Sequence, residues 1–403
     1  MNATAPDRQA RRVLTIAPTP FFGDRGCHVR ILEEIRGLQA RGADVLVVTY
    51  PTGNDVPGVR TARAPNAPGL RARALGPSYG RLVLDAILFG TTLRAARRFR
   101  PDIVHAHLHE GIAVGLTAAR LVGCPLVADL QGSLRSELVD HRFLRNGGLP
   151  SKLVDGVERW LVRRPDALLV GSTTVARLLA DQDVDPARIV SLPDGVDLTR
   201  FRPMSPDRAQ VDRLGLRDKR VVVFLGVLTP YQGVDVLIEA APRVLDVVPD
   251  AHFLIMGYPN EERYRRIVSQ RGLDRDVTFP GRIPYEDAAK WLNLGAVAVS
   301  AKTSLTESNG KLLNYMACGL PVVATDTPVN RELLGETGIY AAVGDPAALA
   351  ARLIELLQAP IRAHEVGATL RRRVEEEFSW PHLTERLLRV YERLLADPTA
   401  AAA

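Results

Sequence analysis

Short apolar runs alternate with amphipathic segments along almost the whole chain. RRVLTIAP, DVLVVTY, DIVHAH and PLVADLQG contain few polar positions, as expected of parallel strands that are covered on both faces. Apolar positions recur with helical spacing from Val29 to Leu38, before Gly42, over GIAVGLTAARLVG and near 151–164. DALLVGS, a short helix and RIVSLP complete this first half. The pattern predicts an α/β fold.

The alternation stops at SLPDGVDLTRFRPMSPDRAQ, whose Pro, Gly and Asp residues indicate an interdomain linker. It resumes with KRVVVFLG, a helix over 234–247, AHFLIMG, a helix near 260–271, and then VTFPG, AVAVSAK and GIYAA. Three helical segments close the chain, and the last is WPHLTERLLRVYERLL. We therefore predict two Rossmann-like, doubly wound domains facing across a cleft. Ligands of such sheets bind beyond the carboxyl ends of the strands.

Composition favours a globular cytoplasmic protein. The 403 residues are 46% apolar and 24% charged, and no apolar run reaches the ~18 residues of a membrane span. The segment MNATAPDRQARR lacks the apolar region of a signal peptide. Cys27, Cys124 and Cys318 are odd in number and read as buried side chains or free thiols in a reducing compartment.

The net charge of +6 is unevenly distributed, because the segment from Arg60 to Arg100 holds nine arginines and a single acid, Asp85. One interpretation is a solvated face in a chain that prefers arginine. The other is a surface that meets a phosphorylated acceptor or anionic lipid, which would place the protein peripherally at the inner membrane face. We expect no nucleic-acid partner, since the segment has few aromatics and no binding motif.

Lysine is rare in this chain. The five lysines are Lys152, Lys219, Lys290, Lys302 and Lys311. Lys302 precedes the stretch TESNGKLLNYMACGLPVVATDTP and Lys311 lies within it, where Asn309, Gly310 and Lys311 open a predicted helix. Backbone N–H groups and a compact ammonium at a helix start attract an anion, and a glycine lets it approach the backbone. The alternative is an ordinary N-cap at Asn309 beside a solvated lysine.

Neither a Walker A loop nor a dinucleotide fingerprint is present, so we expect no dinucleotide cofactor and no P-loop nucleotide site.

HAHLHEG places His105, His107 and His109 at alternating positions, followed by Glu110. The strand is expected to end near His107, which would put His109 and Glu110 in a loop. Three interpretations remain open: a zinc site, a polar cleft lining, or ordinary histidines at a strand end.

Several of these motifs together resemble the retaining glycosyltransferases of family 4, which have the GT-B fold. The motifs are DIVHAHLHEG, RIVSLPDGVD, FLGVLTPYQGVDVLIEAAP, VTFPGRI and NGKLLNYMACGLPVVATDTP, and their order covers nearly the whole chain. The resemblance implies an acceptor-side domain over 1–203, a donor-nucleotide domain over 204–378, and a final helix over 379–403 that crosses back to the first domain. It also implies a nucleotide-sugar co-substrate, no metal or other cofactor, and an acceptor that is a glycan, a lipid or a small molecule.

The chain departs from the family pattern at positions expected to contact the ligands. The family has an arginine and a lysine at the diphosphate, and this chain has Val227 and Gln232 at those positions. Asn314 replaces a family carboxylate, Gln131 replaces a histidine, and Asp194 replaces an asparagine. A further family acid would fall at Thr306, which leaves Glu307 one place out of register. Lys302 and Lys311 could replace the missing cations.

The resemblance assigns three groups of site residues. The catalytic group is Lys311, Glu307 and His109. The donor-binding group is Gly23, Lys302, Asn309, Gly310, Leu312, Asn314 and Arg282. The acceptor-side group is Arg25, Glu110 and Gln131. We expect a glycosyltransferase; the alternatives are a catalytically silent nucleotide-sugar-binding protein and a GT-B sugar-nucleotide epimerase.

Overall fold

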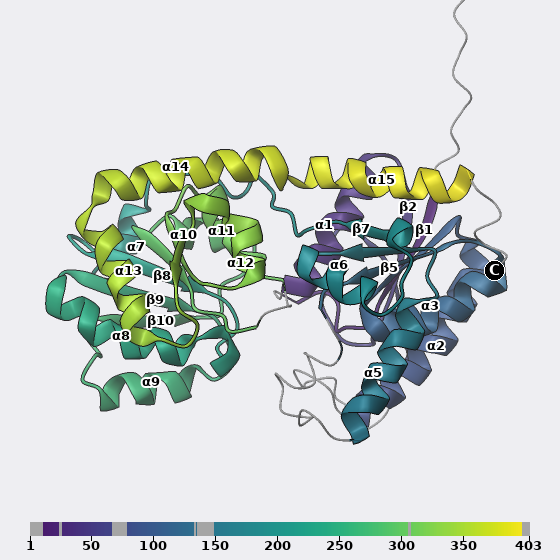
Figure 1. Cartoon of the computed structure of the whole chain (residues 1–403), viewed down its shortest axis with the longest axis horizontal. Helices are drawn as coiled ribbons and strands as arrows, with labels where there is room; N and C mark the ends of the chain where they lie inside the picture. The colour runs from purple at the N-terminus through teal and green to yellow at the C-terminus, as the bar shows by residue number, and fades with distance from the viewer. Residues whose placement is uncertain are drawn as a thin grey trace, which may run out of the picture. The chain divides into compact units, whose positions relative to one another are not determined.

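The structure, a computed structural model, describes residues 11–23, 26–66, 79–132, 134, 149–304 and 308–396 (Figure 1). Its chain divides into two compact units. Unit 1 comprises Met1–Gly23, Cys27–Leu192 and Leu383–Ala403, and unit 2 comprises Asp24–Gly26 and Pro193–His382. Each unit is built on a parallel sheet with helices on both faces, so the predicted Rossmann-like fold class is confirmed.

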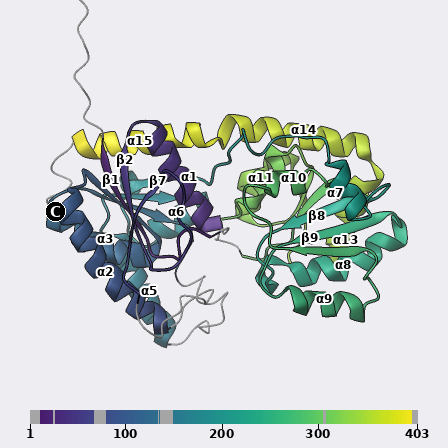
Figure 2. The same cartoon turned by 180° about the vertical axis from the view of Figure 1, so that it is seen from behind.

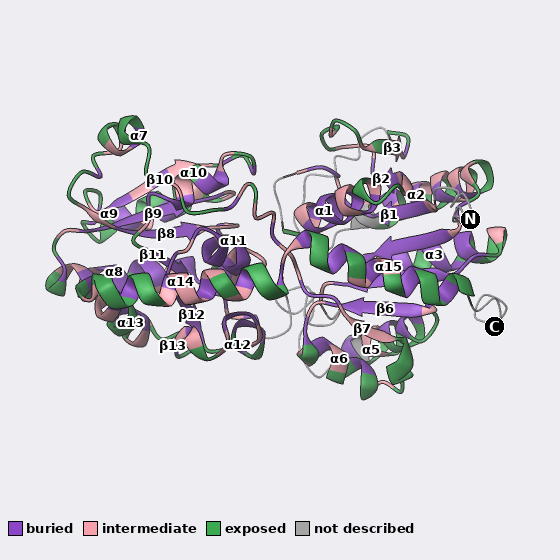
Figure 3. Cartoon of the chain, turned by 90° about the horizontal axis from the view of Figure 1, so that it is seen from above, coloured by how far each residue is buried: buried purple, intermediate pink, exposed green. Residues whose placement is uncertain are grey.

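Unit 1 contains a seven-stranded sheet in the order β3-β2-β1-β4-β5-β6-β7. Its strands are β1 (Arg12–Ala17), β2 (Asp44–Thr49), β3 (Arg60–Arg63), β4 (Ile103–His107), β5 (Leu126–Leu130), β6 (Ala167–Val170) and β7 (Ile189–Ser191). Every residue of β4, β5 and β6 is buried, and β6 is visible as a buried strand in Figure 3. This explains why these segments read as continuous apolar runs.

Helices cover both faces of this sheet. They are α1 (Gly26–Ala40), α2 (Tyr79–Phe99), α3 (Leu108–Val122), α5 (Leu149–Val162), α6 (Thr173–Ala180), the 3₁₀ turn η1 (Pro186–Arg188) and α15 (Trp380–Ala396). Helices α2, α3 and α5 lie on one face and α1 and α15 on the other, as two opposite views show (Figures 1 and 2). Ion pairs Arg11–Glu392 (2.8 Å) and Arg41–Glu385 (2.9 Å) attach α15 to unit 1.

Unit 2 contains a six-stranded sheet in the order β10-β9-β8-β11-β12-β13. Its strands are β8 (Arg220–Leu225), β9 (Ala251–Met256), β10 (Val277–Gly281), β11 (Val297–Ser300), β12 (Val322–Thr325) and β13 (Ile339–Ala341). Its helices are α7 (Arg208–Arg213), α8 (Val234–Val247), α9 (Glu261–Gln270), α10 (Ala288–Leu292), α11 (Lys311–Ala317), α12 (Pro328–Leu334), α13 (Pro346–Gln358) and α14 (Pro360–Glu377), with 3₁₀ turns η2 (Pro230–Gln232) and η3 (Gly335–Thr337).

Two features differ from the sequence prediction. The strand does end at His107, but α3 begins at once with Leu108, so His109 and Glu110 lie in the first helical turn and the predicted loop is wrong. The basic segment also contains the 21-residue helix α2, which the sequence pattern did not predict. Within the described ranges, no helix combines the length and apolar character needed to cross a membrane.

Candidate functional site

The strand order of unit 2 reverses direction between β8 and β11. From β8 the chain proceeds outward to β9 and β10, and then returns to place β11 on the opposite side of β8. The loops that follow β8 and β11 therefore diverge and leave a crevice at the carboxyl edge of the sheet. Gly233, in the first loop, has a φ of +76°, and an added Cβ would lie 2.0 Å from the Ala301 carbonyl oxygen in the second. The close approach of the two loops requires this glycine.

Lys311 links these two loops. Its Nζ donates a 2.7 Å hydrogen bond to Oε1 of Gln232, the last residue of η2 in the loop after β8. The same ammonium lies 4.4 Å from the centre of the Phe224 ring, near the end of β8. Lys311 therefore contacts Gln232, the residue that replaces the family's diphosphate lysine. Lys311 also lies at the switch point where a ligand of unit 2 is expected.

Lys302 and Asn309 are buried and hold the loop between β11 and α11. Nζ of Lys302 donates to the Ser308 carbonyl oxygen at 2.6 Å. Nδ2 of Asn309 donates to Oγ of Ser300 (3.1 Å) and Oδ1 of Asn330 (2.7 Å). The side chain of Asn309 does not cap α11, whose N-cap is Gly310, so the N-cap alternative is wrong. These contacts hold the described ends of the loop, residues 301–304 and 308–310, in place.

Gly310 lies against a carboxylate of its own unit. An added Cβ would come within 2.9 Å of Oδ2 of Asp194, which also accepts a hydrogen bond from Oγ of Ser308. Its backbone is helical, with a φ of −53°, so the close contact and not the backbone conformation favours glycine here. Asp194 occupies the predicted linker; the sequence analysis named it as a departure from the family pattern but did not include it in the three groups of site residues.

The other predicted donor-side residues differ in exposure. Leu312 is fully buried, so its side chain contributes to the core. Asn314 is partly exposed and lies one turn after Lys311, on the same face of α11. Arg282 is exposed, with its guanidinium 5.4 Å from the centre of the Tyr258 ring. The predicted residues Glu307 and Arg25 lie outside the described residues.

Unit 1 has a corresponding switch point between β1 and β4. Gly23 lies in the loop after β1, where its N–H and carbonyl oxygen are 2.9 and 3.0 Å from Nδ1 of His28. His109 and Glu110 lie just after β4. His109 is buried, with Nε2 3.4 Å from Oε1 of Glu158 on α5. Gln131 follows β5, and its buried Nε2 has no hydrogen-bond partner among the described residues.

A buried polar cluster lies beneath the switch point of unit 1. Nδ1 of His107 is 2.9 Å from Oδ2 of Asp129, and Arg30 contacts both oxygens of Asp129 at 2.8 Å. Nδ1 of His105 is 2.7 Å from the Tyr391 hydroxyl. Burial, followed by the charge of His107, lowers the pKa of His105 well below its usual value. Burial alone would raise the pKa of Asp129, but the Arg30 guanidinium and His107 hold it well below its usual range.

Comparison with known proteins identifies the family. The family described as "Glycosyl transferase 4-like domain" matches residues 25–195, and "Glycosyl transferases group 1" matches residues 219–359. A "D-inositol 3-phosphate glycosyltransferase" of Acidothermus cellulolyticus is 31% identical over an alignment that covers 97% of this chain and 92% of the relative. The chain belongs to glycosyltransferase family 4.

Solved structures place this glycosyltransferase in the same fold class. The sucrose-phosphate synthase of Thermosynechococcus elongatus has a TM-score of 0.80 at 20% identity, covering 96% of this chain and 99% of the other. Anabaena Alr3699/HepE, solved in complex with UDP-glucose, has a TM-score of 0.75 at 17% identity, covering 95% and 100% of the two chains. These structures show the GT-B fold, and the sequence relatives show the glycosyltransferase activity class.

Several residues near the site of this glycosyltransferase escaped the sequence analysis. Glu34, Asp129 and Tyr391 come from segments far from HAHLHEG, and only the tertiary fold brings them to His105 and His107. Glu158 is likewise separated from His109 by a long segment of chain. Charged residues among the apolar positions of a helix, such as Arg30 and Glu34 in α1, were the available signal.

Proposed function

We propose that this glycosyltransferase binds a nucleoside diphosphate sugar at the switch point of unit 2 and transfers the sugar, with retention of configuration, to a hydroxyl group of an acceptor bound by unit 1. The observation that carries the proposal is the position of Lys311, whose ammonium joins the loops after β8 and β11 through Gln232. A cation at this position would stabilise the charge that develops on the departing diphosphate, which is where such an enzyme gains most of its rate. Lys302 would act by shaping the loop, since its Nζ is bonded to the Ser308 carbonyl oxygen.

We further propose a phosphorylated polyol as the acceptor class. The Acidothermus relative is named for an inositol phosphate, and this chain aligns with it over nearly its full length. The described part of α2 presents exposed Arg94, Arg97 and Arg98, whereas Arg63 is engaged with Asp55 and with the carbonyl oxygens of Phe21 and Asn54. Fixed cations raise the local concentration of an anionic acceptor.

The experiment has two stages. A thermal-shift screen of UDP-, GDP- and ADP-sugars identifies the donor, because a ligand that binds the folded state raises the melting temperature. The best donor, labelled in its sugar, is then incubated with D-inositol 3-phosphate, unphosphorylated inositol and glycerol phosphate. We expect transfer to a phosphorylated acceptor, with an anomeric configuration by NMR that matches the donor. Two outcomes would contradict the proposal. One is donor binding with neither transfer nor slow hydrolysis, and the other is isomerisation of the donor sugar.

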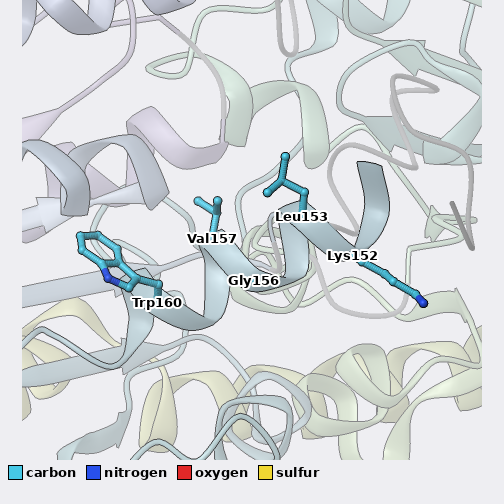
Figure 4. A pocket seen from close by; sticks show the side chains of 5 residues that line it. All are labelled: Lys152, Leu153, Gly156, Val157 and Trp160. Carbon is cyan, nitrogen blue, oxygen red and sulfur yellow. The ribbon is translucent and has the colours of Figure 1, made fainter. Parts of the chain in front are cut away.

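A second candidate is contact of unit 1 with an anionic membrane, and the surface of α5 favours it. Leu153 and Trp160 are 70% and 52% exposed and, with Val157, follow one another along one face of the helix (Figure 4). Lys152 and Arg164 stand at the two ends of this row, and the Arg164 guanidinium lies 4.0 Å from the centre of the Trp160 ring. Apolar side chains beside cations are typical of interfacial helices.

Co-sedimentation with phosphatidylglycerol vesicles at low salt tests this contact. The double variant Leu153→Ser, Trp160→Ser should sediment with these vesicles less than the parent does. Equal sedimentation of the parent with anionic and neutral vesicles would disprove the contact.

A further inference from the structure

Three buried side chains of unit 1 converge on one point outside the predicted donor site: Glu34 of α1 and His105 and His107 of β4. Oε2 of Glu34 lies 3.8 Å from Nε2 of each histidine, and the three ligand atoms all lie within 4.8 Å of one another. Their exposed fractions are 3%, 0% and 1%. We propose that Glu34, His105 and His107 form a binding site for a divalent transition metal, for which Zn²⁺ is the best chemical match.

The ligand atoms and their spacing suit zinc. Two imidazole nitrogens and one carboxylate oxygen would be three of the four ligands of a tetrahedral zinc, and a water molecule would be the fourth. Zinc bonds of about 2.0–2.2 Å place tetrahedral ligand atoms roughly 3.4 Å apart. The two separations from Glu34, at 3.8 Å, exceed this value slightly, and the two imidazole nitrogens, which lie within 4.8 Å of each other, would also have to approach. The two rings stack with their centres 4.5 Å apart and their planes 25° apart. Binding would require each ring to turn until its Nε2 lone pair points at the common centre.

The second nitrogen of each ring is already engaged. Nδ1 of His107 faces Oδ2 of Asp129, and Nδ1 of His105 faces the Tyr391 hydroxyl, at 2.9 and 2.7 Å. If each Nδ1 carries the proton, both rings donate to these oxygens, and each Nε2 is left without a proton on the side of Glu34. Metal-bound histidines are held in this way by a carboxylate or another acceptor on the far side of the ring. Nε2 of His105 is buried and has no hydrogen-bond partner in the part of the chain that the structure describes.

The charges of the cluster also favour a cation. Arg30 is shared between two buried carboxylates, since it contacts Asp129 at 2.8 Å and Oε1 of Glu34 at 3.1 Å. Two buried carboxylates thus share this guanidinium. A divalent ion at Nε2 of the two histidines and Oε2 of Glu34 would place further positive charge beside them.

The proposed ion would have a structural role at the acceptor side. His107 ends β4, immediately before the helical turn that holds His109, and Asp129 lies two residues before Gln131. Zinc would tie α1 to β4 directly and to β5 through Asp129. It would thereby fix the ends of the strands from which the predicted acceptor-side residues project. None of its ligands needs to touch the reacting sugar.

The test measures bound metal and its effect on stability. The full chain without a histidine tag, purified without chelator, should contain about one zinc per chain by inductively coupled plasma mass spectrometry. Dipicolinate should lower its melting temperature, and ZnSO₄ but not MgCl₂ should restore it. His105→Asn and His107→Asn keep an amide near the Nδ1 position and remove Nε2, so each should abolish zinc binding. His252→Gln, a buried histidine of unit 2, is the matched control and should retain the zinc.

Two results would overturn the proposal. One is a metal-free chain whose melting temperature responds to neither zinc nor chelator. The other is full zinc content in both asparagine variants, which would place the metal elsewhere. Should the variants fail to fold by circular dichroism, the parent still decides: loading with Co²⁺ should produce the visible absorption of tetrahedral nitrogen and oxygen coordination, and its absence refutes the site.

Discussion

At the residue scale, Lys311 is the side chain on which the proposed donor site depends. Its Nζ lies between Gln232 and the Phe224 ring, at the point where the loops after β8 and β11 meet. Lys311→Ala should remove a charge-assisted contact to the donor diphosphate, which is about 1.5–3 kcal/mol of binding free energy. We expect donor affinity to fall by roughly tenfold or more and the transfer rate to fall further, because leaving-group charge grows toward the transition state.

Isothermal titration with the donor and initial-rate measurements check this prediction. Lys290→Ala is the matched control, because Lys290 is an exposed lysine of the same unit whose Nζ is 3.2 Å from Asp287 on the surface. The control should bind and turn over like the parent. If Lys311→Ala did so as well, the donor phosphates would have to lie elsewhere.

His252 should make the stability of unit 2 depend on pH. Burial, with a smaller effect of Lys219, lowers the pKa of its ring below the usual value of 6.5, while Nε2 bonds Oγ1 of Thr278 at 2.8 Å. Below about pH 6.5 the unfolded chain therefore binds a proton that the folded chain does not. As the pH is lowered from 6.5, the free energy of unfolding decreases by up to ~1.4 kcal/mol per pH unit, until the folded ring also protonates.

Urea unfolding at pH 7.5 and 5.5 tests the sign of this dependence. His252→Gln retains a polar group for Thr278 but cannot titrate in this range, so its loss of stability between the two pH values should be smaller than that of the parent. His364→Gln, on the exposed face of α14, should leave the parent's dependence unchanged. Equal pH dependence in the parent and His252→Gln would show that His252 does not contribute.

At the scale of elements, the turn from η2 to α8 depends on Gly233. Gly233→Ala should destabilise unit 2 by at least about 1–3 kcal/mol, because a residue with a side chain would be strained at a φ of +76° and its Cβ would meet the Ala301 carbonyl oxygen. Gly215→Ala is the control: its φ is +65°, but nothing lies within 4 Å of the added Cβ. Thermal unfolding should show the larger loss for Gly233→Ala, together with weaker donor binding. Equal losses of stability in the two variants would mean that the close approach of Gly233 to Ala301, in the loop after β11, contributes nothing.

The same scale shows what could be predicted from the sequence. The helix Val234–Val247 was predicted because burial of one face gives its apolar residues a helical period, and the strand Ala251–Met256 was predicted because burial of every residue makes it a continuous run with few polar positions. Helix α2 was missed because its arginines and glycines blur that period, although Leu84, Leu88 and Ala96 reach the core. Lys302 was predicted as a donor ligand, but only the fold shows that it is buried beneath its loop. Contacts such as His109–Glu158 join distant segments and leave no local pattern.

At the scale of the whole molecule, the two units differ in how the chain builds them. Apart from Asp24–Gly26, unit 2 is one continuous stretch, Pro193–His382, with its own buried core. We expect residues 193–382, expressed alone, to fold and to bind the donor with an affinity within a few-fold of the full chain, because Lys311, Gln232, Lys302 and Asn309 all belong to this stretch. Circular dichroism and titration check this. A fragment that folds without binding would show that the donor also needs residues of unit 1.

Unit 1 is assembled from both ends of the chain, and this has a consequence for its synthesis. Its sheet is translated before unit 2, but α15 is translated after unit 2. With α15 come Tyr391, which bonds His105, and Arg386, whose guanidinium donates to the carbonyl oxygen of Ser191 at the end of β7. A nascent chain that has reached unit 2 therefore still exposes the face of unit 1 that α15 will cover. Unit 1 is begun before unit 2 and completed after it, and throughout that interval its α15-facing surface is open to chaperones or to a second nascent chain.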